Sequence, residues 1–150
     1  MKKFILLVED NPDHELLLAN VQKHISTPII FARDGAVAID FLFTTGDYDG
    51  RDISTSPSLI LLDLKLQKVS GFEVLRRIRS DARTKIIPVV IFSSSTEEQD
   101  IIACYNFGAN SYVCKPVDYG RYCETMKLVT KYWLSLNRYV PGQPILAILS

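Results

Sequence analysis

The chain has 150 residues, of which 47% are hydrophobic and 23% charged, as expected of one folded domain with a core of ordinary size. Seventeen basic residues balance seventeen acidic ones, which excludes an excess of positive charge for binding a nucleic acid or a membrane surface. The three cysteines have no Cys-x-x-Cys spacing and are expected to be free thiols in a reducing cytoplasm.

Five short apolar runs are expected to form strands. Val, Ile, Leu and Phe dominate them without polar alternation, which is typical of strands that are covered on both faces. The runs comprise residues 4–8, 29–32, 59–62, 87–92 and 112–113. The first run is too short for a signal-peptide core or a membrane span and stops at Glu9, so we predict a buried strand there as well.

Segments with helix-start signals lie between these runs. Asn11-Pro12-Asp13 supplies an N-cap, a proline for the first helical position and an acid near the positive helix end. Ser70 and Ser95 are each followed three residues later by a glutamate, as in a capping box. The polar segment 44–57 is expected to be a long surface loop. The last helix should begin near Asp118, with an apolar face formed by Tyr122, Met126, Val129 and Trp133.

The alternation of five strands with five helices predicts an α/β fold, a doubly wound parallel sheet with helices on both faces. In such sheets the ligand site lies beyond the carboxyl ends of the strands. The residues that directly follow the strands are therefore the candidates for a site. They are Glu9 and Asp10 after the first strand, Asp63 after the third, Ser93 after the fourth and Lys115-Pro116 after the fifth.

Three carboxylates at one edge of a sheet repel one another strongly. Two such charges about 4 Å apart cost roughly 4 kcal/mol at an effective dielectric constant near 20. A bound cation would relieve this repulsion, and hard oxygen ligands in an incomplete protein cage favour magnesium. Asp63 alone would fit a helix cap or a turn equally well, but that explanation does not cover suitable residues after several different strands.

With these residues the sequence resembles the response regulator receiver family over residues 3–136. The resemblance implies a flavodoxin-like fold for residues 1–137, with residues 138–150 as a C-terminal tail. The long loop before the third strand and the ending Tyr132-Trp133-Leu134 further resemble small regulators paired with bacterial phytochrome-type histidine kinases. The family motifs are Glu9-Asp10, Asp63 after the run 59–62, Gly71-Phe72-Glu73-Val74-Leu75, Ser93, and Gly108-Ala109-Asn110-Ser111-Tyr112-Val113-Cys114-Lys115-Pro116.

The resemblance also implies a single-domain regulator of a two-component phosphorelay, which is a signalling protein and not an enzyme. Asp63 would accept a phosphoryl group from a phosphohistidine on a sensor histidine kinase or a histidine phosphotransfer protein. Magnesium would be held by Glu9, Asp10, Asp63 and the backbone carbonyl of Lys65.

Four further residues have implied roles around the phosphoryl group. Lys115 would pair with a phosphoryl oxygen, and Pro116 makes the Lys115–Pro116 bond a candidate for the cis isomer. Ser93 and Tyr112 would form a switch that changes the surface presented to a downstream protein partner. Tyr112 would also fit as an ordinary core or edge aromatic residue.

Two positions depart from the family pattern. Gln67 stands where a proline is common, and Ser70 where an acid or a similar cap is frequent, so the loop after Asp63 is expected to be less rigid. Lys65 and Ser95 lie near the expected phosphoryl site and could alter the access of water.

Two alternatives from other functional classes remain open. A pseudo-receiver would bind partners without phosphorylation, but the intact acidic pair, Asp63, Ser93 and Lys115 argue against it. A flavodoxin-like cofactor protein would need a phosphate-binding loop where this chain has Glu9-Asp10, whose charges would repel a flavin phosphate. The apolar run 145–149 in the tail is expected to cover the domain itself or a partner subunit, and a homodimer through the switch face is a further possibility.

Overall fold

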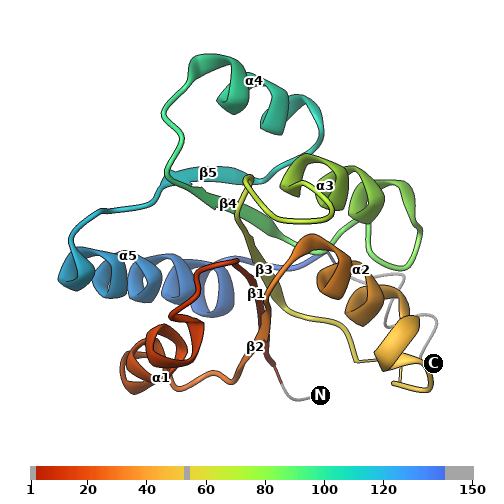
Figure 1. Ribbon diagram of the computed structural model, residues 1–150, viewed down its shortest axis with the longest axis horizontal. Helices are drawn as coiled ribbons and strands as arrows, with labels where there is room; N and C mark the ends of the chain where they lie inside the picture. The colour runs from red at the N-terminus through yellow and green to blue at the C-terminus, as the bar shows by residue number, and fades with distance from the viewer. Residues whose placement is uncertain (1–2, 53–54, 141–150) are drawn as a thin grey trace.

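Five parallel strands form the central sheet of the computed structural model, which describes residues 3–52 and 55–140 (Figure 1). The strand order is β2-β1-β3-β4-β5. This arrangement confirms the predicted doubly wound parallel sheet. The strands are β1 (Ile5–Val8), β2 (Ile29–Ala32), β3 (Leu59–Leu62), β4 (Val89–Ser93) and β5 (Ser111–Cys114).

Four α-helices connect the strands, α5 follows β5, and together these helices cover both faces of the sheet (Figure 1). The predicted long loop contains one 3-10 turn, η1 (Gly46–Tyr48), and α5 continues into a π-helical segment, η2 (Tyr132–Leu136). Among the described residues no helix is long and apolar enough to cross a membrane. The helices are α1 (His14–His24), α2 (Gly35–Phe43), α3 (Gly71–Ser80), α4 (Glu98–Asn106) and α5 (Tyr119–Lys131).

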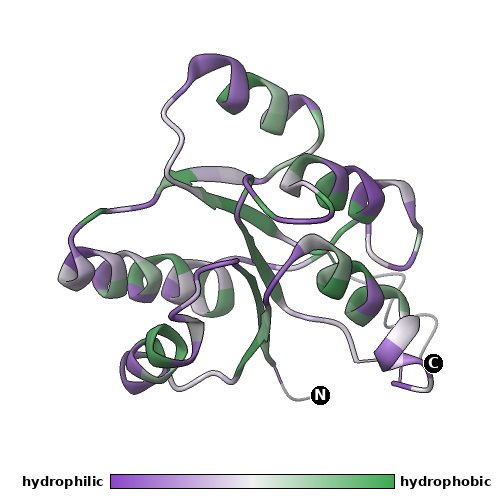
Figure 2. Ribbon diagram, viewed as in Figure 1, coloured by the Kyte–Doolittle hydropathy of each residue, from purple (hydrophilic) through white to green (hydrophobic). Residues whose placement is uncertain are grey.

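The sheet separates two hydrophobic cores because successive strand residues point to opposite faces. Leu6, Ile60 and Ile91 pack with α2 and α3, whereas Leu7 and Leu61 pack with α1 and α5. Every residue of β1, β3 and β4 is buried, which explains why these runs show no polar alternation. Figure 2 shows the same division, with hydrophobic strands between helices whose polar side faces outward.

The strand register brings the ends of β1 and β3 to the same level, and β4 continues beyond them to Ser93. Val8 pairs with Leu62, and Leu62 pairs with Ile91. The ladder continues for one more step, because the Asp63 amide donates to the Val8 carbonyl at 3.1 Å. The residues that follow these strands are therefore held beside one another by backbone hydrogen bonds before any side-chain contact is considered.

Two predicted helix starts are correct. Ser70 accepts a hydrogen bond from the Glu73 amide, and Asp118 accepts hydrogen bonds from the amides of Gly120 and Arg121. The predicted apolar face of the last helix is also found: Tyr122 and Met126 are buried, and Val129 and Trp133 are half-buried against the same core.

Two other predicted helix starts are wrong. The first helix begins after Asp13, and Asn11 instead closes a turn by accepting the Asp13 amide at 2.8 Å. The helix predicted to begin at Ser95 begins at Glu98. The Ser95 hydroxyl oxygen accepts the amide of Glu97 at 3.3 Å instead of that of Glu98, and the hydroxyl donates to the Asp100 carboxylate at 2.6 Å. The β4–α4 loop is therefore longer than the capping-box pattern suggested.

The predicted tail is described only as far as residue 140. Tyr139 closes this part of the chain onto the domain, because its hydroxyl donates to the carbonyls of Ser58 and Trp133 at 3.1 and 3.0 Å. The Lys3 ammonium donates to the carbonyl of Leu134 at 2.8 Å. The apolar run 145–149 lies outside the described residues, so its expected packing stays a prediction.

Gly71 packs tightly against the backbone of the loop that carries Asp63. A Cβ atom at this position would lie 2.1 Å from the Asp63 carbonyl oxygen and 2.7 Å from the Leu64 Cα atom. We expect Gly71→Ala to lower the free energy of unfolding by about 1–3 kcal/mol, as overpacking against backbone does. Urea unfolding followed by circular dichroism measures this change.

Gly120→Ala is the matched control for this prediction. Its Cβ atom would meet only a carboxylate oxygen of Asp118, at 3.3 Å, and alanine favours a helix by up to about 1 kcal/mol over glycine. We expect stability equal to or above that of the parent. Equal stability of the Gly71→Ala variant and the parent would contradict the tight packing of this loop.

Candidate functional site

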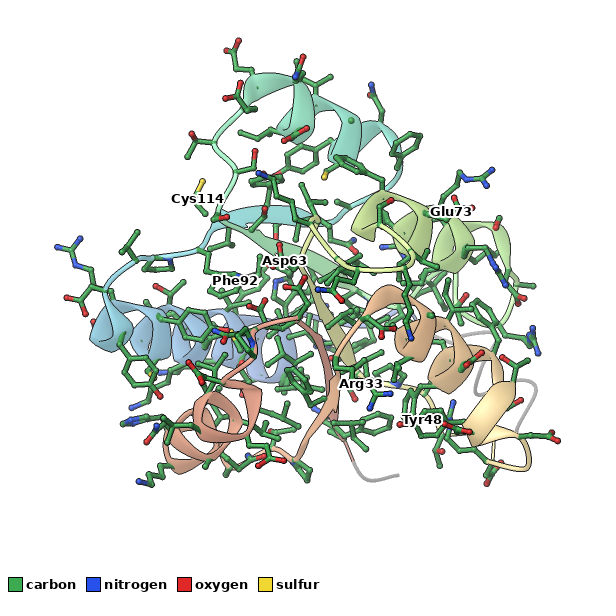
Figure 3. The ribbon with its side chains drawn as sticks, viewed as in Figure 1. Arg33, Tyr48, Asp63, Glu73, Phe92 and Cys114 are labelled. Carbon is green, nitrogen blue, oxygen red and sulfur yellow. The ribbon has the colours of Figure 1, made fainter. Side chains whose placement is uncertain are left out.

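Three carboxylates meet at the carboxyl edge of the sheet. Glu9 and Asp10 follow β1, Asp63 follows β3, and one oxygen from each lies within 4.8 Å of the others. Glu9 is 5% and Asp63 6% exposed, so their charges are largely shielded from water. Figure 3 labels Asp63 near the centre of this view. The sequence predicted these three residues at one edge, and the structure brings them together.

Lys115 supplies the positive charge of this cluster. Its ammonium donates to both carboxylate oxygens of Glu9, at 2.7 and 2.9 Å, and to Asp63 Oδ2 at 2.8 Å. The Lys115 amide donates to the Ser93 carbonyl at 2.7 Å, which fixes the start of the side chain next to β4. The second oxygen of Asp63, Oδ1, accepts the Leu64 amide at 2.7 Å. Both oxygens of Asp63 are thus oriented by donors.

The peptide bond between Lys115 and Pro116 is trans, as are all described peptide bonds. The cis isomer proposed for this bond is therefore not found. The trans isomer is favoured even before proline, by about 0.5–1 kcal/mol, and Lys115 reaches both carboxylates without the cis isomer.

The charges of the cluster shift the ionisation of its members. Burial raises the pKa of Glu9 to about 7; Lys115 acts in the opposite direction, and the charge of Asp63 adds to the increase. Burial alone would lower the pKa of Lys115, but the carboxylates of Glu9 and Asp63 outweigh it, so that this pKa lies above its ordinary value. The ammonium therefore stays charged at neutral pH.

One ammonium does not balance three carboxylates. The cluster of Glu9, Asp10 and Asp63 with Lys115 carries a net negative charge when all groups are ionised. Its donors are hard carboxylate oxygens on one side of an open edge, which suits a divalent cation that keeps part of its water shell. The residues present therefore fit a divalent metal ion. Lys65, the predicted carbonyl ligand, lies two residues beyond Asp63 in the same loop, with its side chain exposed.

A second group of polar residues lies at the end of β4. Ser93 is fully buried, and its hydroxyl oxygen accepts the amide of Ser95 at 3.2 Å. The carbonyl of Ser95 accepts the Tyr112 hydroxyl at 2.8 Å. The two predicted switch residues, Ser93 and Tyr112, therefore contact the same residue of the β4–α4 loop. Tyr112 is half-buried, with its ring against the core on the α3 side of the sheet.

Sequence reasoning missed Asp100. Its carboxylate accepts the Ser95 hydroxyl, and this contact joins the loop to the first turns of α4. The available signal was the polar pair at positions 95 and 100, but the capping-box pattern of Ser95 with Glu98 concealed it. The departures at Gln67 and Ser70 remove no group of the site: Gln67 is exposed, and Ser70 caps α3.

Comparison with known proteins gives one consistent family. The family model described as "Response regulator receiver domain" matches residues 5–127. The response regulator Rcp1 of Synechocystis sp. is 38% identical over 134 residues, which cover 88% of this chain and 89% of Rcp1. The probable methanogenesis regulatory protein FilR2 of Methanothrix harundinacea is 38% identical over 136 residues, covering 89% of this chain and 85% of FilR2.

Solved structures agree with this result. The Mn²⁺-bound form of Rcp1 superposes with a TM-score of 0.81 at 35% identity, covering 92% of this chain and 99% of that one. The phosphorylated cyanobacterial phytochrome response regulator RcpA superposes with a TM-score of 0.83 at 35% identity, covering 95% of this chain and all of that one. The divalent ion and the phosphorylation are properties of those two proteins.

The raised pKa of Glu9 predicts a stability that depends on pH in the metal-free protein. A carboxyl group with a folded-state pKa of about 7 against an ordinary 4.5 binds its proton more tightly in the folded state, so stability decreases as the pH rises between these values. We expect Glu9→Gln to be about 1–3 kcal/mol more stable than the parent at pH 8 with a chelator present. This advantage should be nearly absent below pH 4.5.

Urea unfolding at a series of pH values measures this difference. Glu73→Gln is the control, because it removes an exposed carboxylate whose partner is Arg76 on the same helix, at 2.7 Å. We expect this control to leave stability nearly unchanged at either pH, because an ion pair in contact with water contributes little. A Glu9→Gln variant that is no more stable than the parent at pH 8 would contradict the prediction.

Proposed function

The chain belongs to the response regulator receiver domain family of two-component systems, and we propose that Asp63 is its phosphoacceptor. Proteins of this family interact with histidine kinases and with downstream partners, so the chain is a signalling protein. The observation that carries the proposal is the position of Asp63: a buried carboxylate with both oxygens oriented by donors, beside two further carboxylates and an ammonium.

The proposed reaction is the transfer of a phosphoryl group from a phosphohistidine. An oxygen of Asp63 attacks the phosphorus atom, a P–O bond forms, and the P–N bond breaks as the imidazole leaves with the electron pair and takes up a proton. The product is an acyl phosphate on Asp63. The Leu64 amide holds one oxygen of the nucleophile, and Lys115 holds the other at 2.8 Å. Positioning of this kind provides much of the catalysis in phosphoryl transfer.

We propose that the divalent ion is magnesium, held by Glu9, Asp10, Asp63 and the backbone carbonyl of Lys65. Bound there, magnesium would neutralise the charge that develops on the phosphoryl oxygens. The three carboxylates within 4.8 Å of one another support this assignment, and so does the Mn²⁺-bound form of the relative Rcp1. Lys115 already bridges two of these carboxylates, so it is close enough to pair with a phosphoryl oxygen on Asp63.

We propose that Ser93 and Tyr112 transmit the change to the surface. A phosphoryl group on Asp63 would accept a hydrogen bond from the Ser93 hydroxyl, and Ser93 and Tyr112 share the contact residue Ser95. Ile102 and Tyr105, on the neighbouring α4, are 59% and 49% exposed. Their exposure supports a protein contact on this face, with a downstream partner or with a second copy of the chain.

The proposed phosphodonor is a sensor histidine kinase, either directly or through a histidine phosphotransfer protein. The likeness to Rcp1 and to the phytochrome response regulator RcpA supports a kinase of the phytochrome type. We place the protein in the cytoplasm, because the proposed donor, the free thiols and the acyl phosphate chemistry all suit that compartment.

Acetyl phosphate tests the phosphoacceptor without the unidentified kinase. We expect incubation of the parent with acetyl phosphate and magnesium to add the mass of one phosphoryl group, because Asp63 is oriented for attack. Asp63→Asn should remain unmodified, since the amide is a far weaker nucleophile than the carboxylate. Intact-mass spectrometry measures the adduct, and a chelator should suppress it in the parent.

Asp47→Asn is the matched control, an exposed aspartate in the 3-10 turn remote from the strand ends. It should be modified to the same extent as the parent. An adduct that persists in Asp63→Asn would place the phosphoacceptor elsewhere. A parent that neither binds magnesium nor forms an adduct would favour a pseudo-receiver.

A further inference from the structure

Ser95 is a point of contact between the predicted switch and α4. Its amide donates to the Ser93 hydroxyl at 3.2 Å, and its carbonyl accepts the Tyr112 hydroxyl at 2.8 Å. Its own hydroxyl donates to Asp100 Oδ2 at 2.6 Å. Ser95 is 7% exposed, so these contacts form where water competes poorly. The backbone of one residue thus holds both switch side chains, and its side chain is held by Asp100.

The contact with Ser95 leaves the Ser93 hydroxyl able to donate a hydrogen bond. A serine hydroxyl has one hydrogen to donate and lone pairs that accept. Because the Ser95 amide occupies a lone pair of Ser93, this contact does not use the Ser93 hydrogen, which a phosphoryl oxygen on Asp63 could accept. The orientation of the Ser95 amide therefore decides how the Ser93 hydroxyl is presented.

Asp100 is suited to fix the orientation of Ser95. It lies half-buried near the start of α4, and its carboxylate gives a short, charge-assisted hydrogen bond. The Ser95 hydroxyl also accepts the Glu97 amide at 3.3 Å, so the side chain is held from both sides. Loss of the carboxylate would leave Ser95 with fewer restraints between Ser93 and α4.

We propose that Asp100 is a positioning residue for phosphorylation, acting through Ser95 to hold the β4–α4 loop in the arrangement in which Ser93 can bind the phosphoryl group. This inference rests on the proposed phosphoacceptor role of Asp63. It adds a residue of α4, outside the cluster at the strand ends, to the groups that control that reaction. The contact works in both directions, because a shift of Ser93 toward a phosphoryl group pulls on α4 through the same two hydrogen bonds.

The direction in which affinity changes when Asp100 is removed distinguishes a positioning role from a simple effect of its charge. Asp100 is negative, so electrostatic repulsion alone would make its removal strengthen the binding of an anionic phosphoryl analogue. Positioning predicts the opposite. When the binding-competent loop becomes a smaller fraction of the population, the apparent affinity falls by that same fraction.

The test uses beryllofluoride, an anionic analogue of the phosphoryl group, with saturating magnesium on the full chain. Isothermal titration calorimetry gives its affinity for the parent and for each variant. We expect Asp100→Ala to weaken beryllofluoride binding about three- to tenfold, with magnesium affinity unchanged within about twofold. Ser95→Ala should weaken binding similarly, and the double variant should be no weaker than either single one, since both act on one contact.

Two matched variants complete the experiment. Asp100→Asn removes the charge but keeps an oxygen that can accept the Ser95 hydroxyl, so it should bind within about twofold of the parent. Glu98→Ala removes an exposed acid from the same turn of α4 and should not weaken binding. Circular dichroism and thermal unfolding show whether each variant is folded under the conditions of the titration.

The outcomes distinguish this inference from the function on which it rests. Beryllofluoride binding by the parent but not by Asp63→Asn, together with unchanged or tighter binding by a folded Asp100→Ala, overturns the role of Asp100 and leaves the phosphoacceptor intact. Equal weakening by Asp100→Asn and Asp100→Ala also overturns it, since an oxygen that can still accept the Ser95 hydroxyl would then not preserve binding. Binding by the parent and Asp63→Asn alike contradicts the proposed phosphoacceptor itself.

Discussion

The ammonium of Lys115 between the carboxylates of Glu9 and Asp63 is the interaction on which the site depends. It joins the ends of β1, β3 and β5 through contacts of 2.7 and 2.8 Å. Buried charges are costly unless they are paired, and a single ammonium leaves this cluster with an excess of negative charge. The carboxylates of the site therefore still repel one another, and a divalent cation would reduce this repulsion. Burial keeps the pKa of Glu9 near 7, well above that of an ordinary carboxyl group, and the charge of Asp63 adds to this increase.

The sheet can tolerate this cluster because its own stability is secured elsewhere. Two cores cover the strands, and most of the largest fully buried side chains belong to the strands themselves, among them Leu6, Leu7 and Ile60. Backbone pairing of Val8 with Leu62 sets the positions of the acidic residues that follow. An architecture of this kind separates stability from chemistry: the strand interiors supply hydrophobic burial, and the strand ends are free to carry unfavourable charge.

Much of the fold and of the site could be predicted from the sequence because both follow from short-range patterns. Apolar runs identify strands covered on both faces, and parallel strands bring Glu9, Asp63 and Lys115 to one edge whatever the loops do. The predictions that failed concern places where alternative hydrogen bonds compete locally. Ser95 matches a capping box, yet its hydroxyl reaches Asp100, and the choice between these partners depends on where β4 ends and α4 begins. The isomer of the Lys115–Pro116 bond is likewise set by tertiary context, which the sequence does not display.

The weak packing of α4 explains how a small change at the strand ends could reach the surface. Cys104 is the only described α4 residue that is buried, whereas α3 buries Gly71, Val74, Leu75 and Ile78. Figure 1 shows α4 at the β5 end of the sheet, beyond the helices that cover its centre. A helix with little buried apolar surface lies at the low end of the stability range within a fold, so a few hydrogen bonds are enough to shift its position. The population of two arrangements changes about tenfold for each 1.4 kcal/mol of differential interaction, which is the scale of one hydrogen bond to a charged group. The proposed phosphoryl group on Asp63, by attracting the Ser93 hydroxyl, would therefore be strong enough to shift α4 without disturbing the two cores beneath it.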